Sequence, residues 1–453
     1  MTTKDTDREA LLSRVLELAT RYGATSADAL FSEGRSTEIR VRLGTTEMVK
    51  QSRNKGLGLR VFCGQSSATT STSDLDAEAL DALVRRTCEA AQVTAKDGHA
   101  GLPAEAAFND AIATDLELFD ARIESLTIAD AIDMTRACES ASLDADPRIS
   151  NSEGAEMSWG IGDTYFANTW GTQRHKRTSS VGLWTAPVAE TPEGKERDYW
   201  YTSARHLEDL SEPGAVGAEA ARRALRRLGA QKPATCEVPV IYESPVASRL
   251  LGALAGALTG GAIYREASYL AGQLGEVIAH PSVTIHDDAR IPRGASSRPY
   301  DGEGLATRRT AVVEQGVLSS YLLDTYSARK LGLKSTRNAA RSLGGSPGAS
   351  PTNFWMTPGA QTLEELIAEV DNGLLVTELI GFGINTVTGD YSQGAVGIWI
   401  ENGELTYPVS ELTVASKLPE MWRTIDGIGS DLDRRRSVSA PSIRIARMTV
   451  GGT

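Results

Sequence analysis

The C-terminal half of this chain is organised around residues 238–247, which read VPVIYESPVA. The run from Val238 to Tyr242 is apolar, and a short apolar run of this kind is typical of a buried strand. An uncharged, Gly-rich apolar stretch, residues 250–264, follows and predicts a helix. The strand therefore passes into a helix, and Glu243 is the charged residue at their junction.

The length and the charge of the chain limit the classes of protein to which it can belong. A length of 453 residues suggests two or three domains with a large core. The net charge is −12, from 47 basic and 59 acidic residues, which argues against nucleic-acid binding as the main function. A local basic patch stays open. The pairs Arg222-Arg223 and Arg226-Arg227 fall at helical spacing, and we interpret them as a solvated helix face.

Targeting signals and cysteine spacing favour a cytoplasmic protein without a membrane anchor. Residues 1–7 are polar and acidic and contain no secretory h-region. The longest uncharged apolar run, residues 250–264, is too short and too Gly-rich to span a bilayer. No two of the four cysteines have metal-ligand or redox spacing, so we expect reduced, mostly buried thiols. They are Cys63, Cys88, Cys138 and Cys236.

The first segment, residues 1–98, predicts a helix, a strand meander and a second helix. Apolar residues recur on one face between Leu11 and Ala19, with Asp7 as the expected N-cap and Gly23 as the expected stop. The second helix is expected over residues 74–94. Four strand-like runs lie between the helices, at residues 27–32, 37–43, 47–53 and 58–64.

A linker at residues 96–107 leads to a second segment, residues 108–230, which can form one lobe with the first. Helices are expected at residues 127–141 and 213–228. Strands are expected between them, at residues 158–167, 179–186 and 197–203.

Residues 231–453 form the expected C-terminal domain, which is rich in strands and turns. Asn402-Gly403 between apolar runs is a strong hairpin signal, and residues 344–351 predict a flexible loop. Strands are expected at residues 283–286, 310–314, 317–323, 374–379, 397–400 and 405–409. The predicted fold is α+β, with an N-terminal α/β lobe on an antiparallel sheet and a β-rich C-terminal domain with few helices.

Several long sequence motifs in the C-terminal half resemble those of one bacterial family, TldD/TldE (PmbA). They are TELIGFGINTVTGDYS at 377–392, GAVGIWIENG at 394–403, YSARKLGLKST at 326–336 and GGAIYR at 260–265. The N-terminal half is similar more loosely, in element order and in GLGLRV at 56–61. The resemblance implies a peptidase system, and these words look like the TldE/PmbA branch.

The resemblance also implies that the TldE/PmbA branch lacks zinc ligands. TldD-like chains carry His-Glu-x-x-x-His at the strand–helix junction and a C-terminal Cys as zinc ligands, whereas Tyr242, Ala247 and Ala440 stand at the corresponding positions here. Catalytic zinc needs about three protein ligands and a base. None of the five histidines has another within five residues. We therefore expect no cofactor in this chain and zinc in a partner subunit.

The catalytic carboxylate of the family is matched by Glu243. Without a metal-bound water it has nothing to deprotonate, so we interpret it as a helix N-terminal carboxylate favoured by the helix dipole. Ser244 and Ser248 lie nearby but lack a histidine, so a Ser–His–Asp arrangement is unsupported.

Two polar loops are candidates for a peptide channel or a partner contact. One holds Tyr300 and Asp301, and the other holds Asn385, Asp390 and Tyr391. Loops on a rigid scaffold often carry binding residues, but ordinary turn chemistry explains Asp and Gly equally well. The sequence leaves both readings open.

The function that the resemblance implies is a non-catalytic TldE-like subunit. It would pair with a TldD-like zinc peptidase, shape its channel and help it to cleave unfolded or flexible peptides, including precursor peptides. A homodimer without that partner stays open. The alternatives are a regulatory binding protein of the gyrase-modulator type and an enzyme that modifies peptides without metal.

Overall fold

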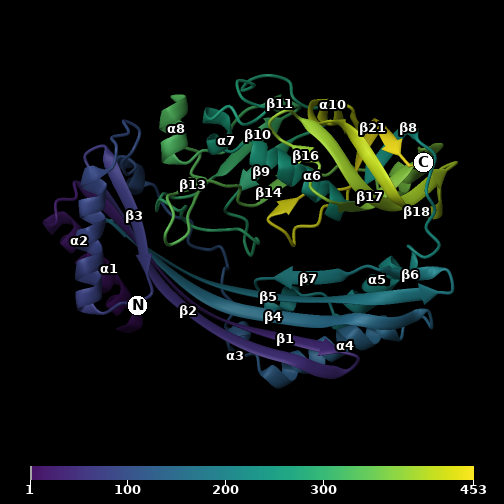
Figure 1. The fold of residues 1–453 in the computed structure, drawn as a ribbon, viewed down its shortest axis with the longest axis horizontal. Coiled ribbons are helices and arrows are strands. Elements are labelled where there is room, and N and C mark those ends of the chain that lie inside the picture. The colour runs from purple at the N-terminus through teal and green to yellow at the C-terminus, as the bar shows by residue number, and fades with distance from the viewer. Residues whose placement is uncertain (1–2, 453) are drawn as a thin grey trace.

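The computed structural model describes residues 3–452, which form an N-terminal lobe built on one large sheet and a β-rich C-terminal domain above it (Figure 1). The predicted α+β class is confirmed. Within the described residues, no helix is long and apolar enough to cross a bilayer.

The sheet of the N-terminal lobe has seven antiparallel strands in the order β3-β2-β1-β4-β5-β6, with β7 also paired to β5. Strands from both predicted segments, residues 1–98 and 108–230, pair in this one sheet. The elements of this lobe are α1 (Thr3–Arg21), β1 (Ser26–Arg42), β2 (Thr45–Cys63), β3 (Ser66–Thr72), α2 (Ala77–Val93), a 3₁₀ turn (Glu105–Asn109), α3 (Ala121–Ser125), α4 (Ile128–Leu143), β4 (Ile149–Asn168), β5 (Gln173–Thr191), β6 (Gly194–Arg197), β7 (Trp200–Ala204), a second 3₁₀ turn (Leu207–Asp209) and α5 (Pro213–Leu225).

The strands are longer than the sequence predicts. The runs at residues 27–32 and 37–43 are one strand, β1, and the runs at 47–53 and 58–64 are both in β2. The sequence prediction broke at polar residues, but these residues pair across the sheet, as Gly34 does with Asn54 and Gly162. The expected N-cap is also wrong, because α1 begins at Thr3 and Asp7 lies inside it.

One face of this sheet carries the helices. Alternate residues of β1 enter two cores on that face: Phe31 packs with α1 and α2, and Ile39 packs with α4. The opposite face turns toward the C-terminal domain, where Leu30 meets Phe166 and Tyr300. The strand period of two therefore separates a helix-covered face from a face that opens onto the second domain.

The C-terminal domain has a second seven-stranded sheet, in the order β15-β8-β21-β18-β17-β16 with β19 on β21, and a smaller five-stranded sheet, β11-β10-β9-β14-β20. The strand expected over residues 317–323 is shorter, since only Val317–Leu318 pairs. The elements are β8 (Cys236–Tyr242), α6 (Ser244–Ala257), α7 (Gly260–Tyr264), β9 (Ile285–Asp288), β10 (Arg309–Glu314), β11 (Val317–Leu318), α8 (Thr325–Leu331), β12 (Ala339–Ala340), β13 (Gly348–Ala349), β14 (Phe354–Met356), α9 (Leu363–Ala368), β15 (Asn372–Ile380), β16 (Ile384–Asn385), β17 (Asp390–Glu401), β18 (Glu404–Lys417), α10 (Leu418–Arg423), β19 (Ile425–Ile428), β20 (Val438–Ser439) and β21 (Ile443–Gly451).

Among the contacts between the domains, two seams lie at opposite ends of the strands, and Tyr300 and Arg205 make further contacts between these ends. At one end, buried Asp28 of β1 is held by Arg60 of β2, with Nε–Oδ2 at 3.1 Å, and by Arg341 of the C-terminal domain, with Nη1–Oδ1 at 2.5 Å. At the other end, Arg435 donates to the carbonyl of Tyr201 at 2.6 Å. Trp200 lies within about 5 Å of the guanidinium groups of both Arg223 and Arg435.

A buried carboxyl near the first seam makes stability depend on pH. Glu303 accepts a hydrogen bond from the amide of Thr325 and lies 4.0 Å from Arg60. Burial, together with the charge of Asp301, raises the pKa of Glu303 from 4.5 to about 7. The protonated form is favoured in the folded protein. Its contribution is therefore complete below pH 4.5 and is lost as the pH rises through about 7.

We expect Glu303→Gln to remove this dependence, because the amide is neutral at every pH. The free energy of unfolding in urea should rise relative to the parent at pH 8 and change less at pH 5. The exposed Glu404→Gln serves as the control and should shift neither value. Parallel pH profiles for Glu303→Gln and the parent would contradict the assignment.

Candidate functional site

The strand–helix junction that the sequence singles out lies in the core of the C-terminal domain. Tyr242 ends β8 and is fully buried. Its hydroxyl donates to the hydroxyl of Tyr391 at 3.1 Å, and the two rings meet edge to face. Burial raises the pKa of Tyr242 well above 10. Tyr242, which the resemblance places at the first zinc-ligand position, is therefore a neutral phenol that is already hydrogen-bonded.

The chain brings the distant position 440 back to this junction. The carbonyl of Ala440 accepts from the hydroxyl of Ser244 at 2.7 Å, and its amide donates to the hydroxyl of Ser248 at 2.9 Å. Ala247 lies on the same helix, and Ala247 and Ala440 are both fully buried. Tyr242, Ala247 and Ala440 belong to one core cluster, so the structure brings the three residues together.

These residues do not fit a zinc ion. Two are methyl groups, and serine hydroxyls occupy the surrounding space. Ser442 accepts from the amide of Ser244 at 3.0 Å and donates to Asp431 at 2.7 Å. Catalytic zinc takes imidazole, thiolate or carboxylate ligands. Among residues 3–452, no group of three or more His, Cys, Asp or Glu side chains is arranged to hold a metal ion.

Glu243 is held by two arginines from the other lobe. Arg226 contacts both carboxylate oxygens, at 3.2 and 3.0 Å, and Arg223 does so at 3.3 and 3.2 Å. Arg223 also donates to the carbonyl of Thr377 at 3.4 Å. The three charged side chains are 12%, 13% and 6% exposed, for Glu243, Arg226 and Arg223. We call this group the Glu243 clamp.

The clamp fixes the protonation state of the carboxylate. Burial by itself would raise the pKa of Glu243, but the charges and hydrogen bonds of Arg226 and Arg223 outweigh burial and lower it. The residue stands at the N-cap of α6, as predicted, but its carboxylate makes no hydrogen bond to the first turn. The arginines, rather than the helix terminus, are its main partners.

The clamp corrects our interpretation of the paired arginines. Only Arg222 is solvated as we predicted: its side chain is 57% exposed and pairs with Glu219 at 2.7 Å. Arg227 is 13% exposed and pairs with Glu378 of the C-terminal domain at 2.6 Å. Helical spacing predicted that all four arginines face solvent. In the structure, however, Arg223, Arg226 and Arg227 contact the C-terminal domain.

Comparison with known proteins assigns all three parts of the chain to one family. Residues 27–91, 121–228 and 235–452 match, in order, domain 1, the central domain and the C-terminal domain of the PmbA/TldA metallopeptidases. The metalloprotease PmbA of Escherichia coli O157:H7 is 36% identical over 447 residues, covering 98% of this chain and 96% of that protein. The chain belongs to the PmbA/TldE branch of the TldD/PmbA family.

Other relatives extend this comparison. A PmbA homologue from Haemophilus influenzae is 34% identical over 97% of this chain and 95% of its own length. The solved structure of a putative modulator of DNA gyrase from Bacteroides thetaiotaomicron has a TM-score of 0.91, 28% identity and 99% coverage of both chains. TldE from Thermococcus kodakarensis shares the fold, with a TM-score of 0.87 at 17% identity, covering 98% of this chain and 100% of that one.

The family-like stretch at residues 377–392 holds three of the candidate residues, and they differ in exposure. Asn385 and Asp390 are exposed. Asn385 accepts from the amide of Val387 at 2.9 Å, and Asp390 pairs with Lys417. Tyr391 is buried against Tyr242. Only the first two are available on the surface of this PmbA/TldE-type domain.

The second candidate loop lies between the lobes. The hydroxyl of Tyr300 donates to the carbonyl of Thr164 at 3.0 Å. Asp301 accepts from the amides of Glu303 and Leu305, as turn chemistry predicts, and burial raises its pKa to about 6. Both Tyr300 and Asp301 are 2% exposed, so neither presents a free surface to a partner.

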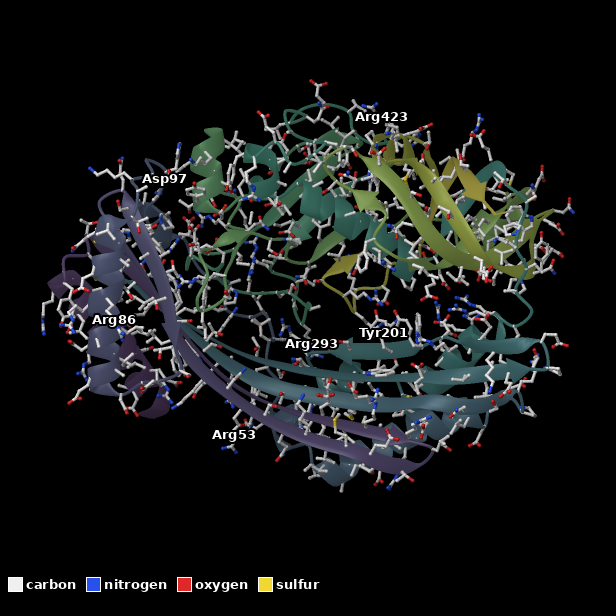
Figure 2. All side chains as sticks on the ribbon, in the orientation of Figure 1. Arg53, Arg86, Asp97, Tyr201, Arg293 and Arg423 are labelled. Carbon is white, nitrogen blue, oxygen red and sulfur yellow. The ribbon has the colours of Figure 1, made fainter. Side chains whose placement is uncertain are left out.

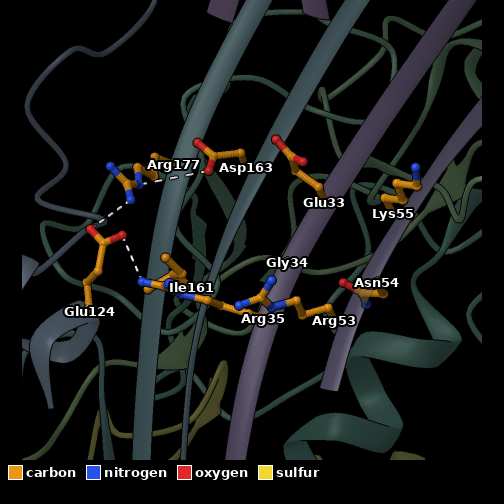
Figure 3. Close-up of a pocket in the computed structure, with 10 residues that line it drawn as sticks. All are labelled: Glu33, Gly34, Arg35, Arg53, Asn54, Lys55, Glu124, Ile161, Asp163 and Arg177. Carbon is orange, nitrogen blue, oxygen red and sulfur yellow. Dashed lines mark hydrogen bonds and ion pairs between the residues drawn. The ribbon is translucent and has the colours of Figure 1, made fainter. Parts of the chain in front are cut away.

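A charged groove of about 510 Å³ lies on the helix-bearing face of the N-terminal sheet (Figure 3). Four of its charged side chains pair with one another: Glu124 binds Arg35 at 2.8 Å and Arg177 at 2.9 Å, and Arg177 lies 3.9 Å from Asp163. Exposed pairs of this kind contribute little to stability.

We expect Glu243→Gln to lower the free energy of unfolding by about 2–4 kcal/mol, because it leaves two arginines partly buried without their carboxylate. Arg226→Gln should have a similar effect, and the double variant should lose less than the sum of the two. Urea unfolding measures all three. Glu219→Gln, whose partner Arg222 is exposed, is the matched control and should change stability by less than about 0.5 kcal/mol. If the stability losses of the two single variants add up fully in the double variant, Glu243 and Arg226 do not act as one unit.

Proposed function

We propose that this chain is the non-catalytic, TldE-like subunit of a heterodimeric zinc metallopeptidase. A TldD-like partner supplies the zinc, and this chain shapes the channel for unfolded or flexible peptides, including precursor peptides. One observation carries the proposal. At the junction where TldD-like chains have zinc ligands and a base, this chain has a tyrosine, two alanines and a carboxylate bound by two arginines.

The existence of paired relatives supports the partnership. Haemophilus influenzae has a PmbA homologue and also a TldD homologue, which is 29% identical to this chain over 252 residues. The two kinds of chain therefore occur together in one organism. A subunit that has lost the ligands but kept the fold has a physical role if it orders the loops of an active partner.

An apolar loop offers a surface for that partner. Phe382 is fully exposed, and Ile380 and Val387 in the same loop are each 53% exposed. Asn385 lies between them in sequence. Exposed aromatic and aliphatic side chains grouped in one loop are typical of a protein interaction site. We assign residues 380–390 to the contact with the TldD-like chain.

We expect peptide cleavage to require both chains and zinc. Neither purified chain alone should cleave a flexible peptide, whereas the mixture should, and a chelator should abolish that activity. Cleavage by this chain alone in chelator would instead support a metal-independent enzyme. Association with gyrase but not with a TldD-like chain would support the regulatory alternative.

Two variants of the clamp separate a structural from a catalytic role of Glu243. A general base is essential, so its loss costs orders of magnitude in rate. We expect Glu243→Gln and Arg226→Gln to lower the kcat of the mixture by the same small factor, less than about fivefold, at a temperature where both are folded. A loss of a hundredfold or more in Glu243→Gln, with Arg226→Gln near the parent, would overturn the non-catalytic assignment.

We expect Phe382→Ser to weaken association with the TldD-like chain by tenfold or more, because one large apolar contact is lost. The thermal midpoint of the isolated chain should stay unchanged. Val93→Ser, at a residue that is 87% exposed on the N-terminal lobe, is the matched control. Analytical ultracentrifugation of the mixture measures both variants, and equal affinities would place the interface elsewhere.

A further inference from the structure

A cavity of about 330 Å³ lies between the two domains, at the seam where Arg60 binds Asp28. Small-molecule sites are often found between domains, and their volumes start at about 300 Å³. The N-terminal lobe lines this cavity with β2, β3 and residues 95–101, and the C-terminal domain lines it with α7, α8 and two loops. Its lining includes Arg60, Phe62, Ser67, Tyr264, Glu303 and Tyr326.

Two buried side chains of opposite charge line this cavity. Arg60 is 7% exposed and Glu303 is 1% exposed. Arg60 binds Asp28 through Nε and Nη2, and Oε2 of Glu303 accepts from the amide of Thr325 at 2.9 Å. The remaining atoms, Nη1 of Arg60 and Oε1 of Glu303, lie 4.0 Å apart, which is too far for a hydrogen bond between them. A donor and an acceptor that are buried side by side in this way indicate a bound group that satisfies both.

Aromatic side chains form the walls beside this polar pair. Phe62 is 3% exposed, and the centre of its ring lies 5.1 Å from the guanidinium of Arg60. The rings of Tyr264 and Tyr326 meet edge to face, with their centres 5.8 Å apart. Apolar, planar walls with one donor and one acceptor between them are typical of a site for a flat aromatic molecule.

Contacts between the domains hold these walls in place. Figure 2 shows Asp97 near the top of β3, beside α8, where its carboxylate accepts from the hydroxyl of Tyr326 at 2.6 Å. The amide of Asp97 donates to the carbonyl of Gln65 at 2.9 Å. Arg329 of α8 donates to the carbonyl of Gly101 at 3.0 Å. The start of the segment that the sequence predicts as a linker is therefore fixed against α8, and the cavity is formed without a ligand.

Three of the stretches that carry the family resemblance reach this cavity. Arg60 belongs to residues 56–61, Tyr264 to residues 260–265 and Tyr326 to residues 326–336. The residues of the Glu243 clamp do not line it. The cavity is therefore separate from the site on which the proposed function rests.

The charges around the cavity favour a neutral ligand. The rings of Phe62, Tyr264 and Tyr326 each have a cation of the chain against them already, at 5.1, 5.3 and 5.4 Å. A cationic ligand would have to compete with these groups for the rings. An anionic ligand would meet the carboxylates of Asp97 and Glu303, which both line the cavity.

We propose that this cavity binds a neutral, planar aromatic molecule that carries an amide. The amide is either the lactam edge of a heterocycle or a carboxamide on the ring. Its oxygen accepts from Nη1 of Arg60, and its N–H donates to Oε1 of Glu303. The oxygen and nitrogen of one amide are about 2.3 Å apart, so a single amide can bridge the 4.0 Å between these two atoms.

The test uses this chain alone and three ligands in titration calorimetry. Hypoxanthine carries a ring lactam, nicotinamide carries a carboxamide on its ring, and purine has the ring system of hypoxanthine without an amide. Because a hydrogen bond to a charged group changes affinity by about tenfold or more, we expect one of the amide ligands to bind at least that much more tightly than purine. The tighter of the two identifies the form of the amide. Purine binding as tightly as both, or no binding of either amide ligand, would overturn the proposal.

Two variants of the lining localise the binding. Glu303→Met removes the acceptor at a similar side-chain length, and Ser67→Trp fills the cavity beside Phe62, with which Ser67 pairs across β2 and β3. Each should weaken binding of the preferred amide ligand by about tenfold or more. Ser52→Trp, at an exposed serine of β2 outside the lining, is the matched control and should bind as the parent does. Unchanged affinity in both lining variants would overturn the assignment to this cavity.

A crystal of the unaltered protein, soaked with the preferred amide ligand, keeps the test independent of variant folding. The amide should lie between Nη1 of Arg60 and Oε1 of Glu303, with its ring beside Phe62. Electron density for the ligand elsewhere, or for water alone between the two atoms, would overturn the proposal. Failure of the two-chain mixture to cleave peptides would refute the proposed function and leave this site standing.

Discussion

The pairing of Glu243 with Arg223 and Arg226 is the interaction on which the arrangement of the two domains depends. It links the end of α5 in the N-terminal lobe to the first turn of α6 in the C-terminal domain. A partly buried carboxylate needs compensating charge, so the domains are held where both arginines reach it. Glu243 is thereby a structural contact between the two domains.

The same geometry accounts for the space between the domains. Contacts at both ends of the long strands hold the C-terminal domain over the sheet, and the middle rows, across β2, β1, β4 and β5, include glycine, serine, threonine and asparagine. Larger side chains there would close the gap.

Sequence reasoning recovered much of the fold but misjudged where buried surfaces lie. The helix after Glu243 and the hairpin at Asn402 follow from local patterns and are present. The breaks predicted within β1 and β2 are absent, because polar residues there are paired across the sheet. The interpretation of Arg223 and Arg226 failed for a related reason, since helical spacing shows which residues share a face and not what covers that face.

The sequence by itself determined that Tyr242, Ala247 and Ala440, and no histidine or cysteine, stand at the positions that the resemblance compares with zinc ligands. It also determined the family, through long words in fixed order. Only the tertiary structure decided that Glu243 is clamped and that Tyr300 and Asp301 are buried. Pairing and burial between residues more than a hundred positions apart depend on how the domains pack, and no local pattern in the chain encodes that packing.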